Sequence, residues 1–416
     1  MKKIKLMMVT GSANNNKFYN LSENSDGTFT VEYGRVGANA QTRTYPMSQW
    51  DRRYKEKVRK GYVDNTELFK EEVVGDSNTT KVDTFKPERT KSVVSIINKL
   101  QGWANKSVQQ NYTVSSESVT QLQIDEAQTV IDDLVSFDLK KSTIEDFNKI
   151  LLNFYTIVPR KMKQVKDHLI STDIKASELK DRKNEIISSE QDTLDVMAGQ
   201  VKLNKTDSND TQVDDTVTNE QDILDVSGLE VDEVTDVKII DMIKSKMQTD
   251  SSRLQKVYEV INKETQKLFD THIKDAKHKD TDLLWHGSRN ENWWSIITTG
   301  LKIRPSNATH TGSMFGNSCY FANKAKKSIG YSSLRGSYWA GGSDNEGLLA
   351  LYEVHLGNQK HIYKHDSSCY DLNYKSIQKD GFDSVYAHGG IDLINDEFMV
   401  YNHDQSTIKY LVLIGS

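Results

Sequence analysis

The chain has 416 residues, of which 36% are apolar and 27% are charged, a composition typical of a soluble intracellular protein with two to four domains. It contains no run of 18 or more apolar residues, and its basic start turns polar too soon for a signal peptide. We therefore expect neither membrane insertion nor secretion, and a cytoplasmic, nucleoid or nuclear location. The two cysteines, Cys319 and Cys369, are too few for a disulfide framework and lack partners at metal-ligand spacing, so no bound metal is expected.

The net charge of −5 is unevenly distributed along the chain. Residues 1–70 contain 13 Lys and Arg against 7 Asp and Glu, a net charge of +6, which leaves −11 for residues 71–416. A basic end on an acidic protein is typical of a surface that binds a polyanion such as nucleic acid. A solvated helix face is the commoner reason for any single charge run.

Residues 1–75 predict a small antiparallel β-sheet followed by one helix. From Lys3 to Pro46, short β-prone runs alternate with turn signals such as "NSDG". The next segment, "MSQWDRRYKEKVRKGY", has apolar or aromatic residues at helical spacing, with Ser48 as the expected N-cap and Gly61 as the expected stop. The exposed side of this helix would carry six basic residues: Arg52, Arg53, Lys55, Lys57, Arg59 and Lys60.

Residues 76–90 are polar and weakly patterned, and they predict a linker. Residues 91–275 predict an all-α bundle, because apolar residues recur there at helical spacing. Ser142 or Thr143 is a cap signal for one of these helices, and Pro159 is its stop signal.

The helical region contains an acidic stretch at about 198–220 that cannot bury enough apolar surface to fold alone, so we expect a mobile loop there. The motif EQD-x-LDV occurs on both sides of it, starting at Glu190 and at Glu220. Two copies are too few to indicate a solenoid.

Residues 276–416 are richer in glycine, aromatic residues and short apolar runs, and form the last predicted domain. Within "LLWHGSR", His286 lies at the end of an apolar run that reads as a buried strand. A lone histidine in such a place is most often structural, so its role depends on the residues around it.

Four ordered blocks in this last domain carry a resemblance to a known family. "LLWHGSR", "GLKIRP", "GSMFGNSCYFANKAKKSIGY" and "EFMVY" together resemble the catalytic domain of the poly(ADP-ribose) polymerases, over roughly residues 280–416. These enzymes are NAD-dependent ADP-ribosyltransferases. The resemblance implies a β-rich catalytic domain that uses NAD+ as its substrate, releases nicotinamide, and modifies protein acceptors including itself.

The resemblance assigns a catalytic His-Tyr-Glu set to His286, Tyr320 and Glu397. In the family the histidine orients the riboses of NAD, so His286 is expected to position the dinucleotide. Glu397 is the expected catalytic carboxylate. Breaking the bond between nicotinamide and ribose builds positive charge on the sugar, which a carboxylate stabilises while it polarises an attacking hydroxyl. A glutamate at this place goes with chain elongation in the family.

The resemblance also assigns residues that contact NAD. Gly287 would let the backbone pair with the carboxamide. Tyr320 and Tyr331 would sandwich the nicotinamide ring, and Ser328 would donate a hydrogen bond to its amide oxygen. The remaining expected contacts are Ser288, Asn292 and Lys302, the last of which stands where an arginine often lines the adenosine side.

The N-terminal segment "TFTVEYGRVGANAQTRTY" resembles the WGR domain, which precedes the helical and catalytic domains in DNA-dependent members of the family. Tyr33 replaces the tryptophan of the name. In these domains the aromatic residue stacks at the end of a DNA strand and basic residues meet phosphates. A β-meander with a core tyrosine is the alternative. The expected contacts with broken DNA are Tyr33, Gly34, Arg35, Arg52, Arg53 and Lys57.

Residues 91–275 resemble the helical regulatory domain of the family, most visibly at "LLNFYTIVP". Asp195 falls where the family has an acidic residue near the adenosine site. The second copy of EQD-x-LDV leaves Asp225 as a rival for that place.

The sequence therefore predicts a multidomain α+β protein: a WGR-like sheet with a helix, an all-α regulatory bundle, and a β-rich ADP-ribosyltransferase domain. Its predicted function is NAD-dependent poly-ADP-ribosyl transfer stimulated by DNA breaks. Two alternatives stay open, a mono-ADP-ribosyltransferase and a catalytically silent scaffold that binds DNA ends. The first alternative is kept because residues 361–392, expected to help place the acceptor, form a short segment for the family.

Overall fold

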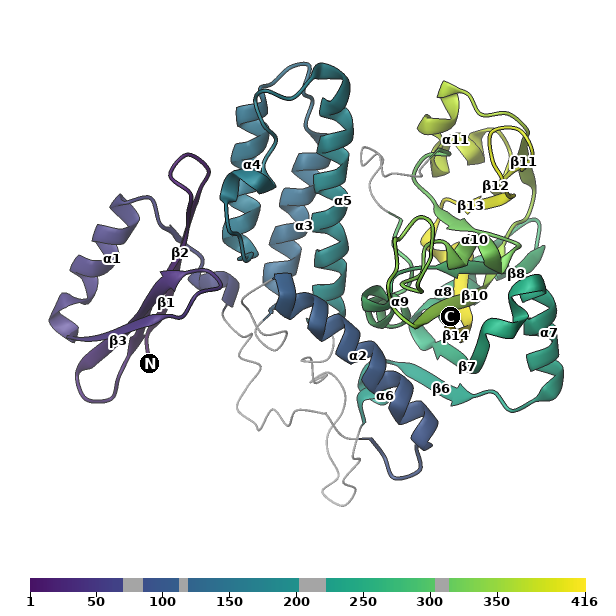
Figure 1. The fold of residues 1–416 in the computed structure, drawn as a ribbon, viewed down its shortest axis with the longest axis horizontal. Coiled ribbons are helices and arrows are strands. Elements are labelled where there is room, and N and C mark those ends of the chain that lie inside the picture. The colour runs from purple at the N-terminus through teal and green to yellow at the C-terminus, as the bar shows by residue number, and fades with distance from the viewer. Residues whose placement is uncertain (70–84, 112–118, 202–221, 304–313) are drawn as a thin grey trace. The chain divides into compact units, whose positions relative to one another are not determined.

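The computed structural model describes residues 1–69, 85–111, 119–201, 222–303 and 314–416, which form a multidomain α+β structure (Figure 1). The chain divides into two compact units. The first unit comprises residues 1–78 and 105–201, and the second comprises residues 79–104 and 202–416. Most of the expected acidic loop and residues 76–84 of the expected linker lie outside the described residues.

The first unit begins with an antiparallel sheet whose strands, in spatial order, are β4 (Gln41–Pro46), β3 (Thr28–Arg35), β2 (Asn15–Glu23), β1 (Lys3–Thr10) and β5 (Val63–Asp64). Alternate side chains of the central strands are buried, among them Leu6, Leu21 and Phe29. The helix α1 (Trp50–Arg59) covers this core, with the Trp50 ring edge-on to Phe29 at a centroid distance of 5.0 Å.

The start of α1 differs from its sequence signal. A short 3-10 turn, Met47–Gln49, precedes the helix. The N-cap of α1 is Gln49, whose side chain makes no capping hydrogen bond. The expectation that Ser48 caps the helix is therefore wrong. The expected stop is confirmed, because Gly61 follows the helix with a φ of 88°, a conformation that glycine adopts without strain.

The rest of the first unit is helical, with α3 (Gln121–Ser136), α4 (Ile144–Ile157), α5 (Ala176–Val201) and the last part of α2 (Lys91–Asn111). Helix α4 begins as its sequence predicts. Thr143 and Asp146 form a reciprocal capping box, and the helix ends two residues before Pro159. Its buried face includes Phe147, Leu151 and Phe154.

The second unit is built on two sheets. The five-stranded antiparallel sheet has the order β6 (Leu229–Glu233), β7 (Leu254–Asn262), β14 (Ser406–Gly415), β10 (Glu346–His355), β8 (Thr281–Gly287). The four-stranded sheet has the order β11 (Gln359–Ile362), β12 (Ser384–Ala387), β13 (Glu397–Val400), β9 (Cys319–Phe321), and only β11 and β12 are parallel. The sequence assigned residues 91–275 to the helical bundle, but strands β6 and β7 lie inside this range. The five-stranded sheet therefore extends across the expected domain boundary at residue 275.

The two sheets meet where β8 runs beside the end of β9. The amide N–H groups of Trp285 and Ala322 each donate to the carbonyl oxygen of the other residue, at 2.8 and 2.9 Å. This pair brings the end of β8 next to Tyr320. The helices of this unit are α6 (Ile223–Val226), α7 (Val237–Met247), α8 (Lys263–Asp275), α9 (Trp293–Thr299), α10 (Ala325–Ile329) and α11 (Tyr374–Lys379).

Among the described residues, no helix has both the length and the apolar character that crossing a membrane requires.

Candidate active site

His286 is held at the junction of the two sheets. It pairs with Ala350 across β8 and β10, and its Nδ1 lies 3.0 Å from the carbonyl oxygen of Tyr320. Because a carbonyl only accepts, Nδ1 carries the proton and Nε2 keeps its lone pair. Burial lowers the pKa of His286, which favours this neutral imidazole. The rings of Trp293, Phe321 and Tyr352 meet the imidazole edge-on, at centroid distances of 5.9 to 6.3 Å.

Gly287 follows His286 and lies against the backbone of α10. A Cβ atom at this position would overlap the carbonyl oxygen of Ser328 and lie 2.7 Å from its carbonyl carbon. Only glycine fits, so the N–H and C=O groups of Gly287 lie in a crowded site that bulkier residues cannot occupy. The Ser328 side chain is itself buried. Nearby, the Ser288 hydroxyl accepts a hydrogen bond from Asn292 Nδ2 at 3.0 Å.

Tyr320 is fixed by the loop that precedes β9. Its hydroxyl donates to the carbonyl oxygen of Gly316 and accepts from the N–H of Phe315, both at 3.0 Å. Burial raises the pKa of Tyr320, and the negative charge of Glu397 raises it further. The same two causes raise the pKa of Tyr331, which follows α10. Both tyrosines are on elements next to a single carboxylate: Tyr320 is on β9, which pairs with β13, and Tyr331 comes just after α10.

That carboxylate belongs to Glu397, the first residue of β13, and it forms an ion pair with Lys327 on α10. The two side chains are only 13% and 12% exposed. Burial lowers the pKa of the Lys327 ammonium, and Glu397 opposes part of that shift. A largely enclosed carboxylate can stabilise a cation that forms beside it, and it can accept a hydrogen bond from an attacking hydroxyl. The structure thus brings together five of the residues that the sequence singled out: His286, Gly287, Tyr320, Tyr331 and Glu397.

Lys302 lies elsewhere in the second unit. It lines a cavity of about 130 Å³ between α8, α9 and the start of β14, together with Gly300, Tyr352 and His403. Among the described residues, none of the three expected catalytic residues lines this cavity. Burial lowers the pKa of His403, the charge of Lys302 lowers it further, and His403 Nε2 accepts from the N–H of Ile303 at 2.7 Å.

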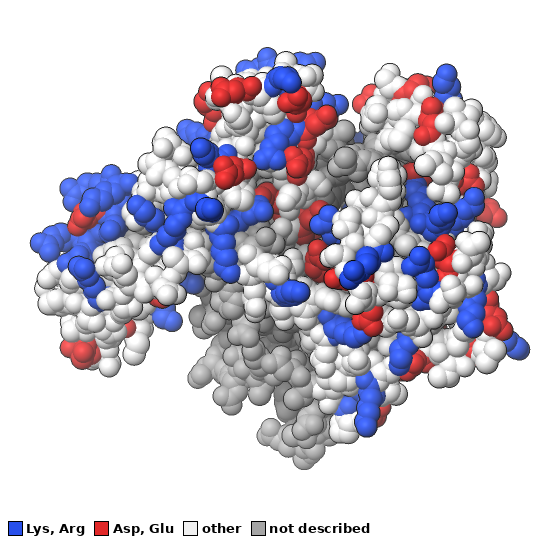
Figure 2. Space-filling model, in the orientation of Figure 1, with Lys and Arg blue, Asp and Glu red and all other residues white. Residues whose placement is uncertain are grey.

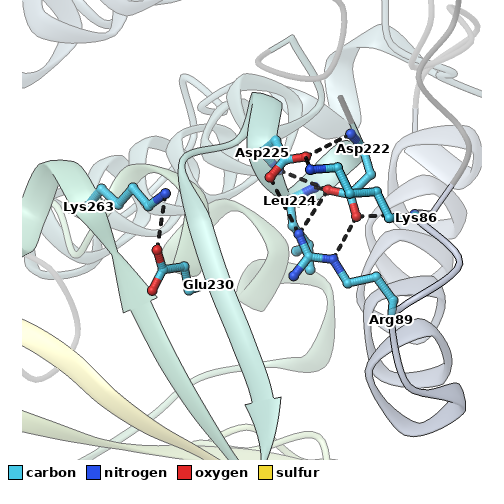
Figure 3. Close-up of polar contacts among 7 residues, drawn as sticks. All are labelled: Lys86, Arg89, Asp222, Leu224, Asp225, Glu230 and Lys263. Carbon is cyan, nitrogen blue, oxygen red and sulfur yellow. Dashed lines mark hydrogen bonds and ion pairs between the residues drawn. The ribbon is translucent and has the colours of Figure 1, made fainter. Parts of the chain in front are cut away.

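Asp225, one of the two candidates for the adenosine side, is held in an ion-pair cluster (Figure 3). Lys86 Nζ lies 2.7 Å from its carboxylate, and the Arg89 guanidinium bridges it to the buried Asp222. Burial alone would raise the pKa of Asp222, but the hydrogen bond from Arg89 leads the opposing contacts that hold it below its usual range. The rival, Asp195, lies on α5 in the first unit, where its carboxylate accepts from Gln191 at 2.9 Å. Its place near adenosine stays a prediction.

Arg35, the expected DNA-binding arginine after the "YG" pair, already has hydrogen-bond partners within the first unit. The Arg35 guanidinium donates to the carbonyl oxygens of Asn14, Met162 and Lys163, at 2.7 to 3.0 Å. Gly34 pairs with Phe18 across β2 and β3. The Tyr33 ring is partly buried, 5.9 Å from the Tyr19 ring.

Some basic residues of α1 lie over tyrosine rings, and others are exposed to solvent. Arg53 lies 3.4 Å from the centroid of the Tyr45 ring, and Lys57 lies 4.1 Å from that of Tyr19. Burial lowers the pKa of Lys57, and neighbouring Lys60 adds to the effect. Arg52 is exposed, and its guanidinium donates to the side-chain oxygen of Gln49 at 3.2 Å. Figure 2 shows basic side chains crowded over α1 and its sheet.

Two features near the site were not assigned from the sequence. The Lys327 ammonium is the partner of Glu397; the family resemblance retains a lysine at this position, but no role was assigned to it from the sequence. The Trp339 indole stacks on Tyr331, and its signal was an aromatic pair between glycines, "GSYWAGG". Among the described residues, no group of three or more His, Cys, Asp and Glu side chains could hold a metal ion.

Comparisons with known proteins identify two domains in the chain. Residues 235–415 match the family model of the poly(ADP-ribose) polymerase catalytic domain, and residues 3–68 match that of the WGR domain. A poly(ADP-ribose) polymerase-like protein, 100L, of Invertebrate iridescent virus 6 is 37% identical over 163 residues, which are 38% of this chain and 84% of the viral protein.

Cellular relatives are similar over a shorter share of their length. Poly(ADP-ribose) polymerase 2 of Zea mays is 30% identical over 34% of this chain and 24% of the plant protein. Poly(ADP-ribose) polymerase 2 of Homo sapiens is 31% identical over 32% of this chain and 26% of the human protein. The chain thus spans about a quarter of the length of these two proteins.

Proposed function

The chain belongs to the poly(ADP-ribose) polymerase family, and on that premise we propose that it is an NAD+ ADP-ribosyltransferase that responds to broken DNA and extends ADP-ribose chains. The observation that carries the proposal is the Glu397 carboxylate, which is 13% exposed, pairs with Lys327 and lies on the strand next to that of Tyr320. Transfer of ADP-ribose needs one anionic group next to the sugar and a flat site for the leaving ring, and the proposal assigns these to Glu397 and to Tyr320 with Tyr331.

In the proposed reaction the chain's own residues bind, orient and stabilise. Tyr320 and Tyr331 hold the nicotinamide ring, and the backbone of Gly287 pairs with its carboxamide. The bond from the ring nitrogen to the ribose carbon breaks, and its electron pair leaves with neutral nicotinamide. Glu397 stabilises the positive charge left on the sugar. The acceptor hydroxyl then bonds to that carbon and gives up its proton through Glu397 to solvent.

His286 is proposed to position the substrate rather than to act as a base. Its neutral imidazole donates through Nδ1 to the Tyr320 carbonyl, which leaves Nε2 free to accept a hydrogen bond from a ribose hydroxyl. Lys327 would hold the Glu397 carboxylate in place through their ion pair.

DNA dependence rests on the WGR match and on the basic surface of α1. Arg52 is best placed for a phosphate, since its side chain is exposed whereas those of Arg35, Arg53 and Lys57 are partly buried against protein partners. The proposed acceptors are protein side chains, including those of the chain itself. The helical region is proposed to be regulatory, and opening of that region on DNA binding would release the activity.

The test is to incubate the full chain with labelled NAD, with and without nicked duplex DNA, and to measure product length on a gel. Long products that appear only with nicked DNA are expected. A single added ADP-ribose would favour the mono-ADP-ribosyltransferase, and no transfer under either condition would favour the silent scaffold. Equal transfer with and without DNA would reject the DNA dependence alone.

A further inference from the structure

Residues 335–344, here named the Trp339 loop, form a closed structure next to Tyr331. The N–H of Arg335 donates to the carbonyl oxygen of Asp344 at 2.7 Å, which closes the base of the loop. The N–H groups of Trp339 and Ala340 both donate to the carbonyl oxygen of Gly330, at 2.8 and 3.0 Å. The backbone hydrogen bonds therefore fix the tip of the loop against the residue that directly precedes Tyr331.

The tip presents two large aromatic side chains to solvent. Tyr338 is 81% exposed and Trp339 is 58% exposed. The Trp339 indole stacks on the Tyr331 ring, with centroids 6.0 Å apart and planes 17° from parallel. Tyr338 meets the indole edge-on at 4.7 Å and 88°. Core burial does not explain an indole that is more than half exposed, whereas its parallel stacking on Tyr331 is a specific contact.

The backbone around this stack is shaped to allow it. A Cβ atom on Gly330 would lie 2.8 Å from Cδ1 of Trp339, which is closer than real side chains approach. At the other side of the loop, a Cβ atom on Gly342 would overlap the backbone of Ser333. Glycine at these two positions lets the loop fold back until the indole reaches Tyr331.

The ring that Trp339 contacts lies in the proposed active site. Tyr331 comes four residues after Lys327, which pairs with Glu397, and Tyr331 is 36% exposed. A tyrosine that is open to solvent on this scale can turn about its side-chain bonds unless a neighbour restrains it. Among the described residues, Trp339 is the aromatic neighbour whose plane follows that of Tyr331.

We propose that Trp339 is a positioning residue of the nicotinamide site: its indole holds the Tyr331 ring in the plane that stacks on nicotinamide, and so sets the affinity for that ring. The inference rests on the proposed function, since it takes Tyr331 as a nicotinamide contact. An aromatic pair changes an equilibrium by about 3- to 10-fold, and loss of the indole should weaken nicotinamide binding by that factor. The chemical step depends on Glu397 and should change little.

The experiment compares the full-length wild type with Trp339→Ala, Trp339→Phe and Tyr338→Ala. Nicotinamide binding is measured by calorimetry, which needs no turnover, and kcat and KM for NAD are measured on the same preparations. Trp339→Ala should weaken nicotinamide binding and raise KM about 3- to 10-fold, with kcat within about twofold. Trp339→Phe should restore most of the affinity, because a phenyl ring can still stack on Tyr331. Tyr338→Ala, the matched control in the same loop, should bind as the wild type does.

Three results would overturn the inference while leaving the proposed function intact: unchanged nicotinamide binding in Trp339→Ala, an equal loss in Tyr338→Ala, or a fall in kcat alone. The first would show that Tyr331 needs no support, and the second that the loop acts only as a whole. A wild-type protein that binds no nicotinamide would overturn both the inference and the proposed function. An unfolding midpoint for each variant separates loss of binding from loss of fold.

Discussion

Glu397 and Lys327 are coupled by burial as well as by charge. Both side chains are nearly enclosed, and removing one partner of a buried pair leaves the other charge in a medium of low dielectric constant. Lys327 can respond by releasing its proton, because burial has already lowered its pKa. Replacing Glu397 therefore removes the negative charge that the reaction needs, and it also changes the protonation of Lys327.

Glu397→Gln should keep the fold and NAD binding, and lower the rate of ADP-ribosyl transfer by roughly two to four orders of magnitude. The amide keeps the shape of the side chain and removes its charge. Transfer is measured with labelled NAD, and chain extension should suffer more than first attachment. The matched control is Glu353→Gln, which breaks a more exposed pair with Lys409 on the same unit and should leave transfer unchanged. Polymer of wild-type length from the Glu397 variant would remove it as the catalytic carboxylate.

At the scale of elements, α1 uses part of its charge to hold its own sheet. Arg53 and Lys57 lie over tyrosine rings, so the cation–π contacts fix the helix on the strands while the charges stay near the surface. Arg52, one residue before Arg53, points to the exposed side. The basic helix is thus both a structural element and a candidate phosphate-binding surface.

Arg52→Ala should weaken DNA binding and reduce the slope of log affinity against log salt by about one unit, because one phosphate contact and its released counterion are lost. The slope is measured with a nicked duplex at several salt concentrations. Arg35→Ala serves as the comparison. Since its guanidinium binds three backbone carbonyls in the first unit, it should lower the free energy of unfolding more than it changes the slope. An unchanged slope in Arg52→Ala would exclude a phosphate contact there.

Helix α8 and strand β10 share a histidine pair that gives the second unit a pH-dependent contact. His272 Nε2 lies 2.8 Å from His355 Nδ1, and His355 Nε2 donates to the carbonyl oxygen of His278 at 2.6 Å. The protons are therefore arranged so that His355 Nδ1 accepts from His272. Burial, and then the neighbouring His355, lower the pKa of His272.

Folding stability should therefore fall as the pH drops below about 6.5, the ordinary histidine pKa. Above that value both the folded and unfolded chains keep His272 neutral. Below it the unfolded chain takes up a proton that the folded chain refuses, and the loss continues until the pH reaches the lowered folded pKa. Urea unfolding between pH 7.5 and 5.5 measures the slope, and His272→Gln should flatten it. Equal slopes in both proteins would assign the pH dependence to other buried histidines.

At the scale of the whole molecule, the catalytic unit extends well before residue 276. Strand β7 pairs with β14 over most of its length, and β6 pairs with β7. Val257 on β7 and Ile243 on α7 belong to the same buried cluster as Trp285 and Val412. The family match beginning at residue 235 agrees with this extent.

A fragment of residues 228–416 should fold, whereas residues 276–416 should not. The longer fragment keeps both sheets, and the shorter one leaves the apolar edge of β14 without a partner and removes part of the buried cluster. Thermal unfolding followed by circular dichroism, at matched concentrations, distinguishes a cooperative transition from none. A cooperative transition in the shorter fragment would mean that the fold of the sheet does not require β6 and β7.

The sequence by itself determined what depends on neighbours along the chain. Strands β1 to β4 of the N-terminal sheet, the cap of α4 at Thr143 and the stop at Gly61 follow from local periodicity and backbone preference, whereas β5 was not predicted. The family followed from four short blocks, because the chemistry of a site fixes residue types at fixed spacing. The same reasoning failed at Ser48, where a 3-10 turn took the place of a side-chain cap.

Only the tertiary structure decided which distant residues share a contact. Strands β6 and β7 lie in a helix-rich stretch, and they join the catalytic sheet because β7 pairs with β14, far along the chain, while β6 pairs with β7. Arg35 is occupied by carbonyls of Met162 and Lys163, and the Trp339 indole reaches Tyr331 only because a closed loop carries it there. Long-range pairing and packing leave no periodic signal in the sequence, so these contacts could be known only from the folded chain.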